Sequence, residues 1–271
     1  MLSPLYGQLS PLRIPTKVAG LDPDALAYIA AVEAADDQAL EEGVATAFTE
    51  FITGCKADGI WSAIKASCIL AGARTLNGAL VPLVGTAPTN NNFVSADYNR
   101  ETGLKGNGTT KYLDSNRSAD SDPQNDSHIS VYQSAASGGI RNLIACYRTT
   151  SSPVVYSGLA TNGTPYYPRL NNSTASMGNQ ANGNTLGLFG ATRSSSSNYQ
   201  CKSGTGSVTT LNITSSAPPA LNYYVFAGNS DGSLSYFHAG RLSFYSIGED
   251  IDLTALNSRV STLMTDLAAA I

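Results

Sequence analysis

Two histidines, His128 and His238, are the first candidates for acid–base or metal chemistry in this chain of 271 residues. An imidazole titrates near neutral pH and is a common zinc ligand. Each histidine lies in a separate predicted strand, with no HxH or HExxH spacing and no cysteine nearby. Zinc sites usually draw their ligands from such spacings. We therefore interpret both histidines as residues on strand faces, and we predict neither a metal nor another cofactor.

The pentapeptide GNSDG, residues 228–232, matches the GxSxG pattern that presents a nucleophilic serine in hydrolases. That pattern works where a strand turns sharply into a helix. Here it separates two strand-like segments, YYVFA and LSYFH. The sequence therefore predicts a hairpin turn, and Ser230 is not expected to act as a nucleophile.

Several carboxylates crowd the polar segment DSNRSADSDPQND and could together bind calcium. They are Asp114, Asp120, Asp122 and Asp126. The EF-hand spacing, with its glycine and terminal glutamate, is absent. We favour a solvated loop here, with a calcium site as the alternative.

The segment PYYPRL is the best candidate for a glycan-binding surface, because it places Tyr166, Tyr167 and Arg169 beside two asparagines. Tyrosine rings can stack on the apolar side of a sugar, while neighbouring polar groups bind its hydroxyls. Tyr199, next to Asn198, is the second candidate. The alternative for all of these tyrosines is half-buried packing on strands.

A β scaffold is predicted for these residues, since the chain from about residue 93 to 249 alternates short apolar–polar runs with Ser, Thr, Asn and Gly. Such alternation between turn-forming residues predicts strands. Eight runs at hairpin-like spacing, with no helical pattern between them, indicate a jelly roll or a similar two-sheet sandwich over residues 93–250. The runs cover residues 129–133, 142–148, 154–158, 186–193, 199–202, 208–211, 222–227 and 241–247.

An apolar, proline-rich arm is predicted for residues 1–20, which contain LSPL twice and a further proline at Pro15. Prolines at this density oppose helix and ladder hydrogen bonding, so the arm should be extended. Its apolar side chains have no local partners, and we predict that they anchor the chain to another protein. A frayed tail is the alternative. The anchoring candidates are Leu5, Tyr6, Leu9 and Leu12.

Helices are predicted on both sides of the sandwich. Residues 21–75 form a helical segment in which Asp22 and Pro23 mark the first helix start, and the pattern continues through Trp61, Ile64 and Cys68. Residues 76–92 form a linker. Residues 251–271 form a C-terminal helix, capped by Asp252, whose apolar residues follow alternating steps of three and four. We expect this helix to lie against the sandwich or the N-terminal helices, with an oligomer contact as the alternative.

The composition excludes several classes of function. Charged residues make up only 13% of the chain, and between Ser127 and Gly248 there are six basic residues and a single acid, Asp231. Basic residues this sparse do not form a nucleic-acid surface. No segment resembles a secretory signal or a membrane span, so we predict no membrane insertion. The cysteines are expected to be buried and reduced, and Cys146 with Cys201 is the pair to consider if a disulfide forms.

A family resemblance appears in four segments of the predicted sandwich, FVSADYNRETGLKGNGTTKYLDSNR, NLIACYR, LGLFGATRSSSSNYQCKSG and YYVFAGNSDGSLSYFHAGRLSFYSIGEDIDLTAL. Together they resemble the concanavalin A-like (LamG-type) jelly roll of tailed-phage virion proteins. The stretch at residues 30–93 resembles the helical and linker region that precedes this jelly roll in marine phage and cyanophage structural proteins. The resemblance covers most of the chain after the N-terminal arm.

The resemblance implies a virion structural protein, made in the host cytoplasm, that displays a lectin-like jelly roll for attachment to the host surface. A tail fibre or receptor-binding component is the first expectation, and a capsid decoration or cement protein is the alternative. The arm would bind other virion proteins, the sandwich would bind a host-surface glycan, and the protein would be a homotrimer. A glycan-active enzyme is the least favoured reading, because glycosidases need two facing carboxylates and the sandwich holds a single acid between Ser127 and Gly248.

Overall fold

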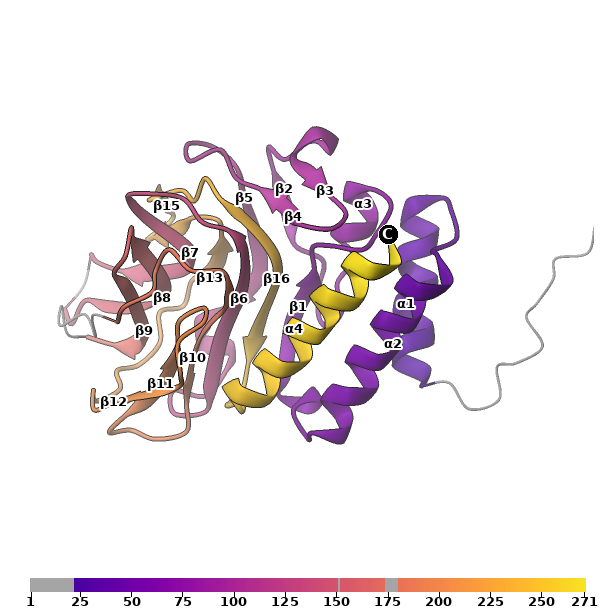
Figure 1. The fold of residues 1–271 in the computed structure, drawn as a ribbon. Coiled ribbons are helices and arrows are strands. Elements are labelled where there is room, and N and C mark those ends of the chain that lie inside the picture. The colour runs from indigo at the N-terminus through magenta and orange to yellow at the C-terminus, as the bar shows by residue number, and fades with distance from the viewer. Residues whose placement is uncertain (1–21, 151, 174–179) are drawn as a thin grey trace, which may run out of the picture.

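The computed structural model describes residues 22–150, 152–173 and 180–271. In these residues the chain forms three layers, which are a layer of helices, an inner sheet and an outer sheet (Figure 1). The predicted anchoring residues Leu5, Tyr6, Leu9 and Leu12 lie outside the described residues. Of the helices that the structure describes, none is long and apolar enough to cross a membrane.

The inner sheet is centred on β16 (Arg241–Gly248), which pairs antiparallel with β6 (Ser127–Ala135). β16 also pairs with β1 (Ile64–Ile69) and with β4 (Gly103–Lys105). The order of the described strands is β12-β11-β10-β6-β16-β4-β3, with β1 beside β16. The other members are β3 (Tyr98–Asn99), β10 (Gly187–Arg193), β11 (Tyr199–Lys202) and β12 (Thr209–Leu211).

The outer sheet is built around β7 (Ile140–Arg148), which pairs along its length with β8 (Val155–Asn162). β9 (Tyr166–Asn172) follows β8 as the next antiparallel strand. The other described strands follow the order β15-β14-β7-β13-β5-β2. Their bounds are β2 (Thr89–Asn91), β5 (Tyr112–Ser118), β13 (Asn222–Val225), β14 (Gly228–Ser230) and β15 (Ser233–Ser235).

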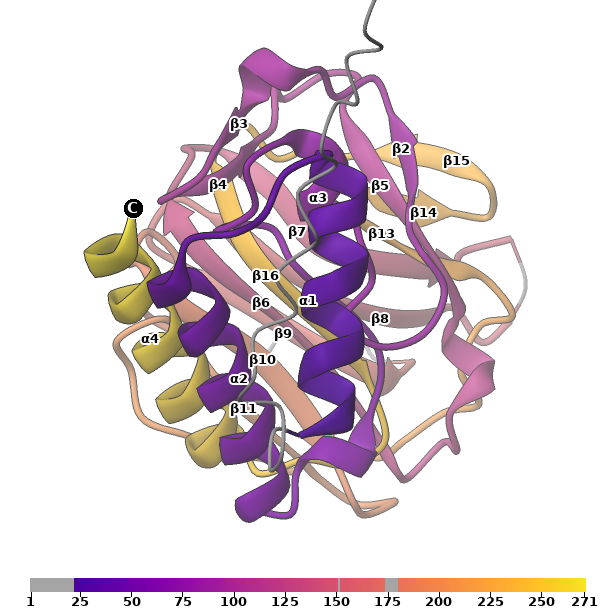
Figure 2. The same cartoon turned by 90° about the vertical axis from the view of Figure 1, so that its right-hand side faces the viewer.

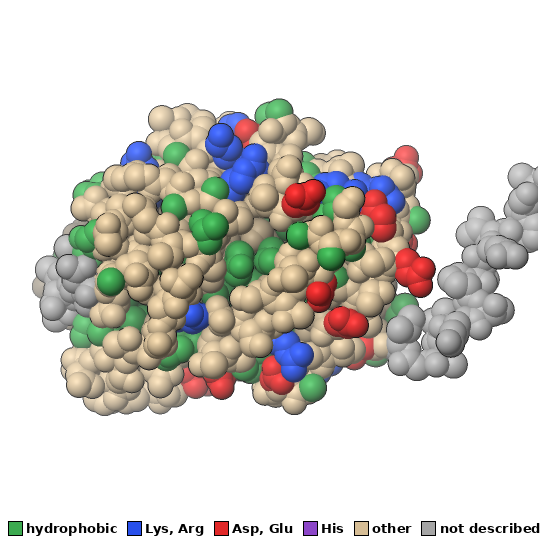
Figure 3. Space-filling view, in the orientation of Figure 1, with side chains coloured by type: hydrophobic (Ala, Val, Ile, Leu, Met, Phe, Trp, Pro, Cys, Tyr) green, Lys and Arg blue, Asp and Glu red, His purple; other side chains and the backbone are tan. Residues whose placement is uncertain are grey.

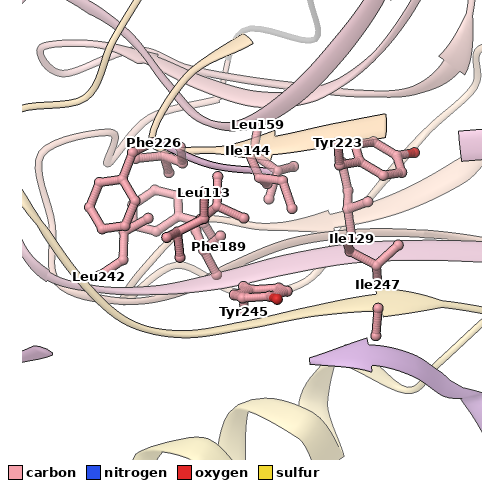
Figure 4. Close-up of a cluster of buried hydrophobic side chains, with 14 of the residues drawn as sticks. Leu113, Ile129, Ile144, Leu159, Phe189, Tyr223, Phe226, Leu242, Tyr245 and Ile247 are labelled. Carbon is pink, nitrogen blue, oxygen red and sulfur yellow. The ribbon is translucent and has the colours of Figure 1, made fainter. Parts of the chain in front are cut away.

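Apolar side chains from the two sheets meet in a shared core (Figure 4). Leu113 and Ile144 of the outer sheet and Phe189 and Tyr245 of the inner sheet are all fully buried there. Burying one side chain of this kind stabilises the fold by roughly 1.5 to 3 kcal/mol. This core holds the sheets face to face and uses one side of each.

The helices bury the second side of the inner sheet (Figures 1 and 2). Phe51 stacks edge-to-face on Phe244 of β16 at 5.8 Å, and Leu253 and Leu256 share the same apolar cluster. The main helices of this layer are α1 (Pro23–Asp36), α2 (Glu42–Ala57) and α4 (Leu253–Ala270), and a short α3 (Leu76–Ala79) contacts α1. The central strands of the inner sheet are therefore covered on both faces.

Most of the predicted elements are confirmed. All eight predicted runs form strands, and the mainly β jelly-roll sandwich with N-terminal helices and a C-terminal helix is observed. Asp22 and Asp252 cap α1 and α4 by accepting hydrogen bonds from the first-turn amides. The four cysteines are buried and free.

One predicted helical stretch is wrong. Trp61 begins a single 3-10 turn, and Ile64 and Cys68 belong to β1. Gly59, with a φ of +72°, follows the end of α2 and allows the chain to leave the helix. Residues 64–69 then complete the edge of β16, where ladder pairing outweighs the weak helical periodicity of the segment.

The apolar stripe of α4 is buried within the same chain. Leu256, Val260, Leu263 and Leu267 are almost fully buried among α2 and the inner sheet. The expectation that α4 lies against the sandwich and the N-terminal helices is therefore confirmed. The trimer predicted from uncovered helices loses this support and stays a prediction.

Arg193, at the end of β10, is a fully buried cation that ties several segments together. Its guanidinium donates to the carbonyl oxygens of Leu170, Ser195, Asn198 and Ile213 at 3.0–3.2 Å. It also lies over the ring of Tyr199, 4.9 Å from the ring centre. Burial lowers the pKa of Arg193 to about 10, so the group stays charged at neutral pH. The hydrogen bonds to four carbonyl groups offset the cost of burying this charge.

Replacing Arg193 with Gln should lower the free energy of unfolding by about 3 to 5 kcal/mol, because four carbonyl groups lose a charged donor inside the protein. Urea unfolding followed by circular dichroism measures this change. Arg148→Gln is the matched control and should cost less than about 0.5 kcal/mol, since Arg148 forms no ion pair with a described residue. Equal losses in the two variants would show that the carbonyl cage does not stabilise the fold.

Candidate functional site

The alternation of β9 separates the predicted glycan-binding residues. Tyr166 is fully buried, and its hydroxyl donates to the carbonyl oxygen of Gly190 at 3.2 Å. Tyr199 is also buried and donates to the carbonyl oxygen of Pro168 at 2.8 Å. Both rings belong to the core between the sheets, and at most 1% of either residue is exposed. The prediction is wrong for these two tyrosines because their strand positions point inward.

Tyr167 and Arg169 point to the opposite face and line a hollow of about 590 Å³ on the outer face of the outer sheet. No other described element covers this face of β7, β8 and β9 (Figure 1). The lining residues come from β7, β8 and β9, from the β14–β15 hairpin and from the segments beside them. They are Ile140, Asn142, Tyr147, Thr149, Tyr156, Gly158, Ala160, Asn162, Tyr167, Arg169, Ser230, Ser235 and Tyr236. We call this hollow the outer groove.

Small residues form part of the floor of the outer groove. Gly158 and Ala160 are outward-facing positions of β8, and Gly158 pairs with Ala145 of β7 on one side and with Arg169 of β9 on the other. A Cβ atom at Gly158 would lie 2.5 Å from the Cβ of Ala145. Glycine is therefore required for the close approach of these strands, and it leaves the floor low between the neighbouring aromatic rings.

Tyrosine rings stand at one end of the floor. Tyr147 and Tyr156, opposite each other on β7 and β8, pack edge-to-face with ring centres 5.4 Å apart. The Tyr147 hydroxyl donates to the side-chain oxygen of Asn142. Burial raises the pKa of Tyr147 far above neutrality, so the hydroxyl remains a neutral donor. The guanidinium of Arg169 lies over the Tyr156 ring, 4.1 Å from its centre.

The β14–β15 hairpin forms one wall of the outer groove. Asp231 and Gly232 both have positive φ values at its turn, which suits a tight two-residue connection. The predicted hairpin turn at GNSDG is thus confirmed, and Ser230 lies on a strand beside that turn. The backbone amide of Asn142 donates to the carbonyl oxygen of Tyr236 at 2.7 Å and fixes the far end of the hairpin. The Tyr236 side chain is 56% exposed at the groove.

The charges at the outer groove are unbalanced. Asp231 is the single acid between Ser127 and Gly248, and its carboxylate accepts hydrogen bonds from Thr149 and from the amide of Thr150. Burial alone would raise the pKa of Asp231, but these hydrogen bonds lower it below its usual value. In the part of the chain that the structure describes, Arg169 forms no ion pair and no hydrogen bond, and its Nε is buried without a partner.

The other candidates for chemistry lie away from the outer groove. Asp114, Asp120, Asp122 and Asp126 bind different partners, for example Arg117 for Asp122 and the amide of Asp250 for Asp126. Among the described residues, no group of three or more His, Cys, Asp or Glu side chains could hold a metal ion.

A second hollow, of about 550 Å³, lies between β10, β11 and the start of α4. Its carboxylates already have structural partners. Asp250 accepts a hydrogen bond from Thr192, and Asp252 caps α4. We regard this hollow as a polar junction between the helix layer and the inner sheet.

Both histidines are buried. His128 lies on β6, as the sequence predicts, whereas the strand prediction is wrong for His238, which lies in the segment between β15 and β16. His128 contacts the hydroxyl of Ser246 at 2.7 Å and the carbonyl oxygen of Glu249, and His238 lies 3.0 Å from the hydroxyl of Ser137. Burial lowers the pKa of His128 to about 4 and that of His238 to about 3. Both imidazoles are neutral at pH 7 and stabilise the core.

The residues that sequence reasoning missed are Tyr147, Tyr156, Tyr236 and Asn142. A usable signal was present in YSGLA, residues 156–160, where Tyr, Gly and Ala alternate with buried Ser and Leu. Small residues at alternate strand positions mark a face that leaves room above it. The hairpin contribution could not be found in this way, because it depends on the parallel pairing of β14 with β7.

No family model and no curated protein matches the sequence. Among solved structures, the CBM40 of the Ruminococcus gnavus IT-sialidase is similar at 13% identity over 57% of this chain and 93% of that chain, with a TM-score of 0.42. The botulinum neurotoxin serotype D binding domain is similar at 8% identity over 74% of this chain and 51% of that chain, with a TM-score of 0.44. Likeness at this level concerns the β-sandwich alone.

The buried histidines predict an acid-sensitive fold. Their folded-state pKa values lie below the unfolded value of about 6.5, so the stability they contribute is present above pH 6.5 and is lost as the pH falls. Thermal or urea unfolding between pH 6.5 and pH 5 should show a loss of about 2 kcal/mol for each histidine. The carboxylates contribute little in this window, because their unfolded pKa values are lower.

His128→Gln is the variant that isolates one of these groups. It should be less stable than the wild type at pH 7 and should lose less stability between pH 6.5 and pH 5. A variant that loses stability in parallel with the wild type would assign the acid sensitivity to other groups.

Proposed function

We propose that this protein is a non-catalytic, lectin-like binding protein that holds a glycan in the outer groove. The observation that carries the proposal is a set of tyrosine rings around a low floor, on the sheet face that no described element covers. The volume of about 590 Å³ is within the range of small-ligand sites.

The groups in the outer groove match the needs of a sugar. The tyrosine rings offer faces that can stack on the C–H side of a sugar ring. Asn162, Ser230 and Ser235 add amide and hydroxyl groups that can exchange hydrogen bonds with sugar hydroxyls. An apolar floor with a few directed polar groups is typical of carbohydrate and other small-molecule sites.

The same groups do not support hydrolysis. A glycosidase places two carboxyl groups on either side of the bond that it cleaves. The residues that line the outer groove include no acid, and the carboxylate of nearby Asp231 is occupied by Thr149 and Thr150. Binding without chemistry is therefore the function that this geometry supports best.

The expected virion role is also a proposal. In a phage tail fibre or receptor-binding protein, the binding surface must face outward while another surface meets the particle. The outer sheet, which carries the outer groove, and the helix layer lie on opposite sides of the molecule (Figure 1). Acidic side chains are visible over the helix layer in Figure 3. This arrangement supports attachment through the helix side, for a tail component or for the alternative, a capsid decoration protein.

Glycan binding can be tested on an oligosaccharide array, followed by calorimetric titration of the best ligand. Tyr167→Ala should weaken binding by about tenfold or more, because it removes an aromatic contact from the centre of the site. Val94→Ala is the matched control, since Val94 is 56% exposed and does not line the outer groove. Circular dichroism should show both variants folded. If no array ligand binds, or if both variants bind as the wild type does, the proposal is wrong.

A further inference from the structure

Two arginines of this fold each pack on a tyrosine ring but differ in their hydrogen bonds. Arg193 and Arg169 each lie over a tyrosine ring, at 4.9 Å from Tyr199 and 4.1 Å from Tyr156. The donors of Arg193 are bonded to protein carbonyl oxygens. For Arg169, the described residues supply neither a carbonyl nor a carboxylate partner. The fold therefore satisfies the guanidinium of Arg193 internally, whereas no acceptor for Arg169 is found among the described residues.

Among the described residues that line the outer groove, Arg169 is the one that carries a charge. Asp231, the single acid between Ser127 and Gly248, is held by Thr149 and Thr150 at the hairpin. A hollow lined by one sign of charge attracts the opposite sign and raises its local concentration.

We propose that the outer groove selects an anionic sugar, whose carboxylate or sulfate pairs with the guanidinium of Arg169. This inference rests on the proposed glycan-binding function and deepens it. The guanidinium lies over the Tyr156 ring, and an anionic group can accept two parallel hydrogen bonds from the N–H donors at the edge of its plane. Because the guanidinium is already ordered, less side-chain entropy is lost when the ligand binds.

The other residues that line the outer groove are uncharged, and some of them lie far from Arg169. On β8, Asn162 lies four residues beyond Gly158, the partner of Arg169, which corresponds to about 13 Å. Ile140 pairs with Asn162 at that end, and 47% of its surface is exposed. The site thus has a cationic part and an apolar part, which suits an acidic sugar with a neutral sugar or an acyl group attached.

The test uses the full-length protein on an array of neutral, carboxylated and sulfated oligosaccharides. We expect the strongest ligands to be anionic, and the carboxylated and sulfated sets identify which acid is preferred. For a carboxylated ligand, the methyl ester of the same oligosaccharide should bind about ten- to a hundredfold more weakly; for a sulfated ligand, the desulfated form should do so. Affinity should also fall as salt rises.

Variants then assign the effect to one residue. Arg169→Gln should reduce affinity for the anionic ligand by about ten- to a hundredfold and should have little effect on binding of the neutral derivative. Arg169→Lys should restore part of the loss, because the charge returns without the paired donors. Lys105→Gln is the charge-matched control on β4, an exposed residue of the inner sheet, and it should bind as the wild type does.

The outcomes separate the two proposals. Neutral ligands that bind as well as anionic ones, with Tyr167→Ala weakened and Arg169→Gln unchanged, would overturn the anionic preference and leave the glycan-binding function standing. Equal losses of affinity in Arg169→Gln and Lys105→Gln would also overturn it, because the change in the net charge of the protein would then explain both losses. An array without any ligand would overturn both proposals.

Discussion

The two-sided burial of the inner sheet is the constraint on which the rest of the structure depends. Leu242, Tyr245 and Ile247 of β16 face the core between the sheets, and Phe244 faces the helices. A strand buried on both faces needs a covering layer on each side, and α2 and α4 supply the second one. Once these layers are in place, the outer face of the outer sheet is the sheet surface that the described chain leaves open. The location of the groove follows from this layering.

The outer groove combines strands that are close in sequence with a hairpin that is far away. β7, β8 and β9 form a continuous meander, whereas the β14–β15 wall arrives from some 80 residues later in the chain. Asp231 joins the two parts by accepting hydrogen bonds from Thr149 and Thr150. A polar contact of this kind holds the wall in position and removes the one nearby carboxylate from use. The same interaction therefore shapes the groove and leaves its arginine without an acidic neighbour.

Much of the fold could be predicted because its signals are local. Alternation between turn-forming residues located β6, β7 and β16, and the three-and-four spacing of Leu and Val located α4. β1 was missed because residues 61–68 carry a weak helical periodicity, and their strand pairing is with residues almost 180 positions away. Short strands such as β2 and β14 give too few residues for a pattern to show. Arg193 could not be identified as buried, since its carbonyl partners come from three segments, namely β9, the β10–β11 connection and the stretch after β12.

The candidate site shows where sequence reasoning stops. PYYPRL contained two residues of the outer groove, Tyr167 and Arg169, and two of the core, Tyr166 and Leu170. The register of β9 against β8 decides which is which. Two adjacent tyrosines look alike in the sequence, but in a strand their side chains point to opposite faces of the sheet. Tyr147 and Tyr156 join Tyr167 through pairing between strands, which a pattern within one strand does not reveal.

A crystal structure of the full-length protein with its tightest-binding acidic oligosaccharide would test the central claim most directly. We expect a sugar ring against Tyr156 or Tyr167, with its acidic group within hydrogen-bond distance of the Arg169 guanidinium. A ligand bound elsewhere, for example in the polar hollow beside α4, with the outer groove empty, would contradict the assignment of the site and of its selectivity.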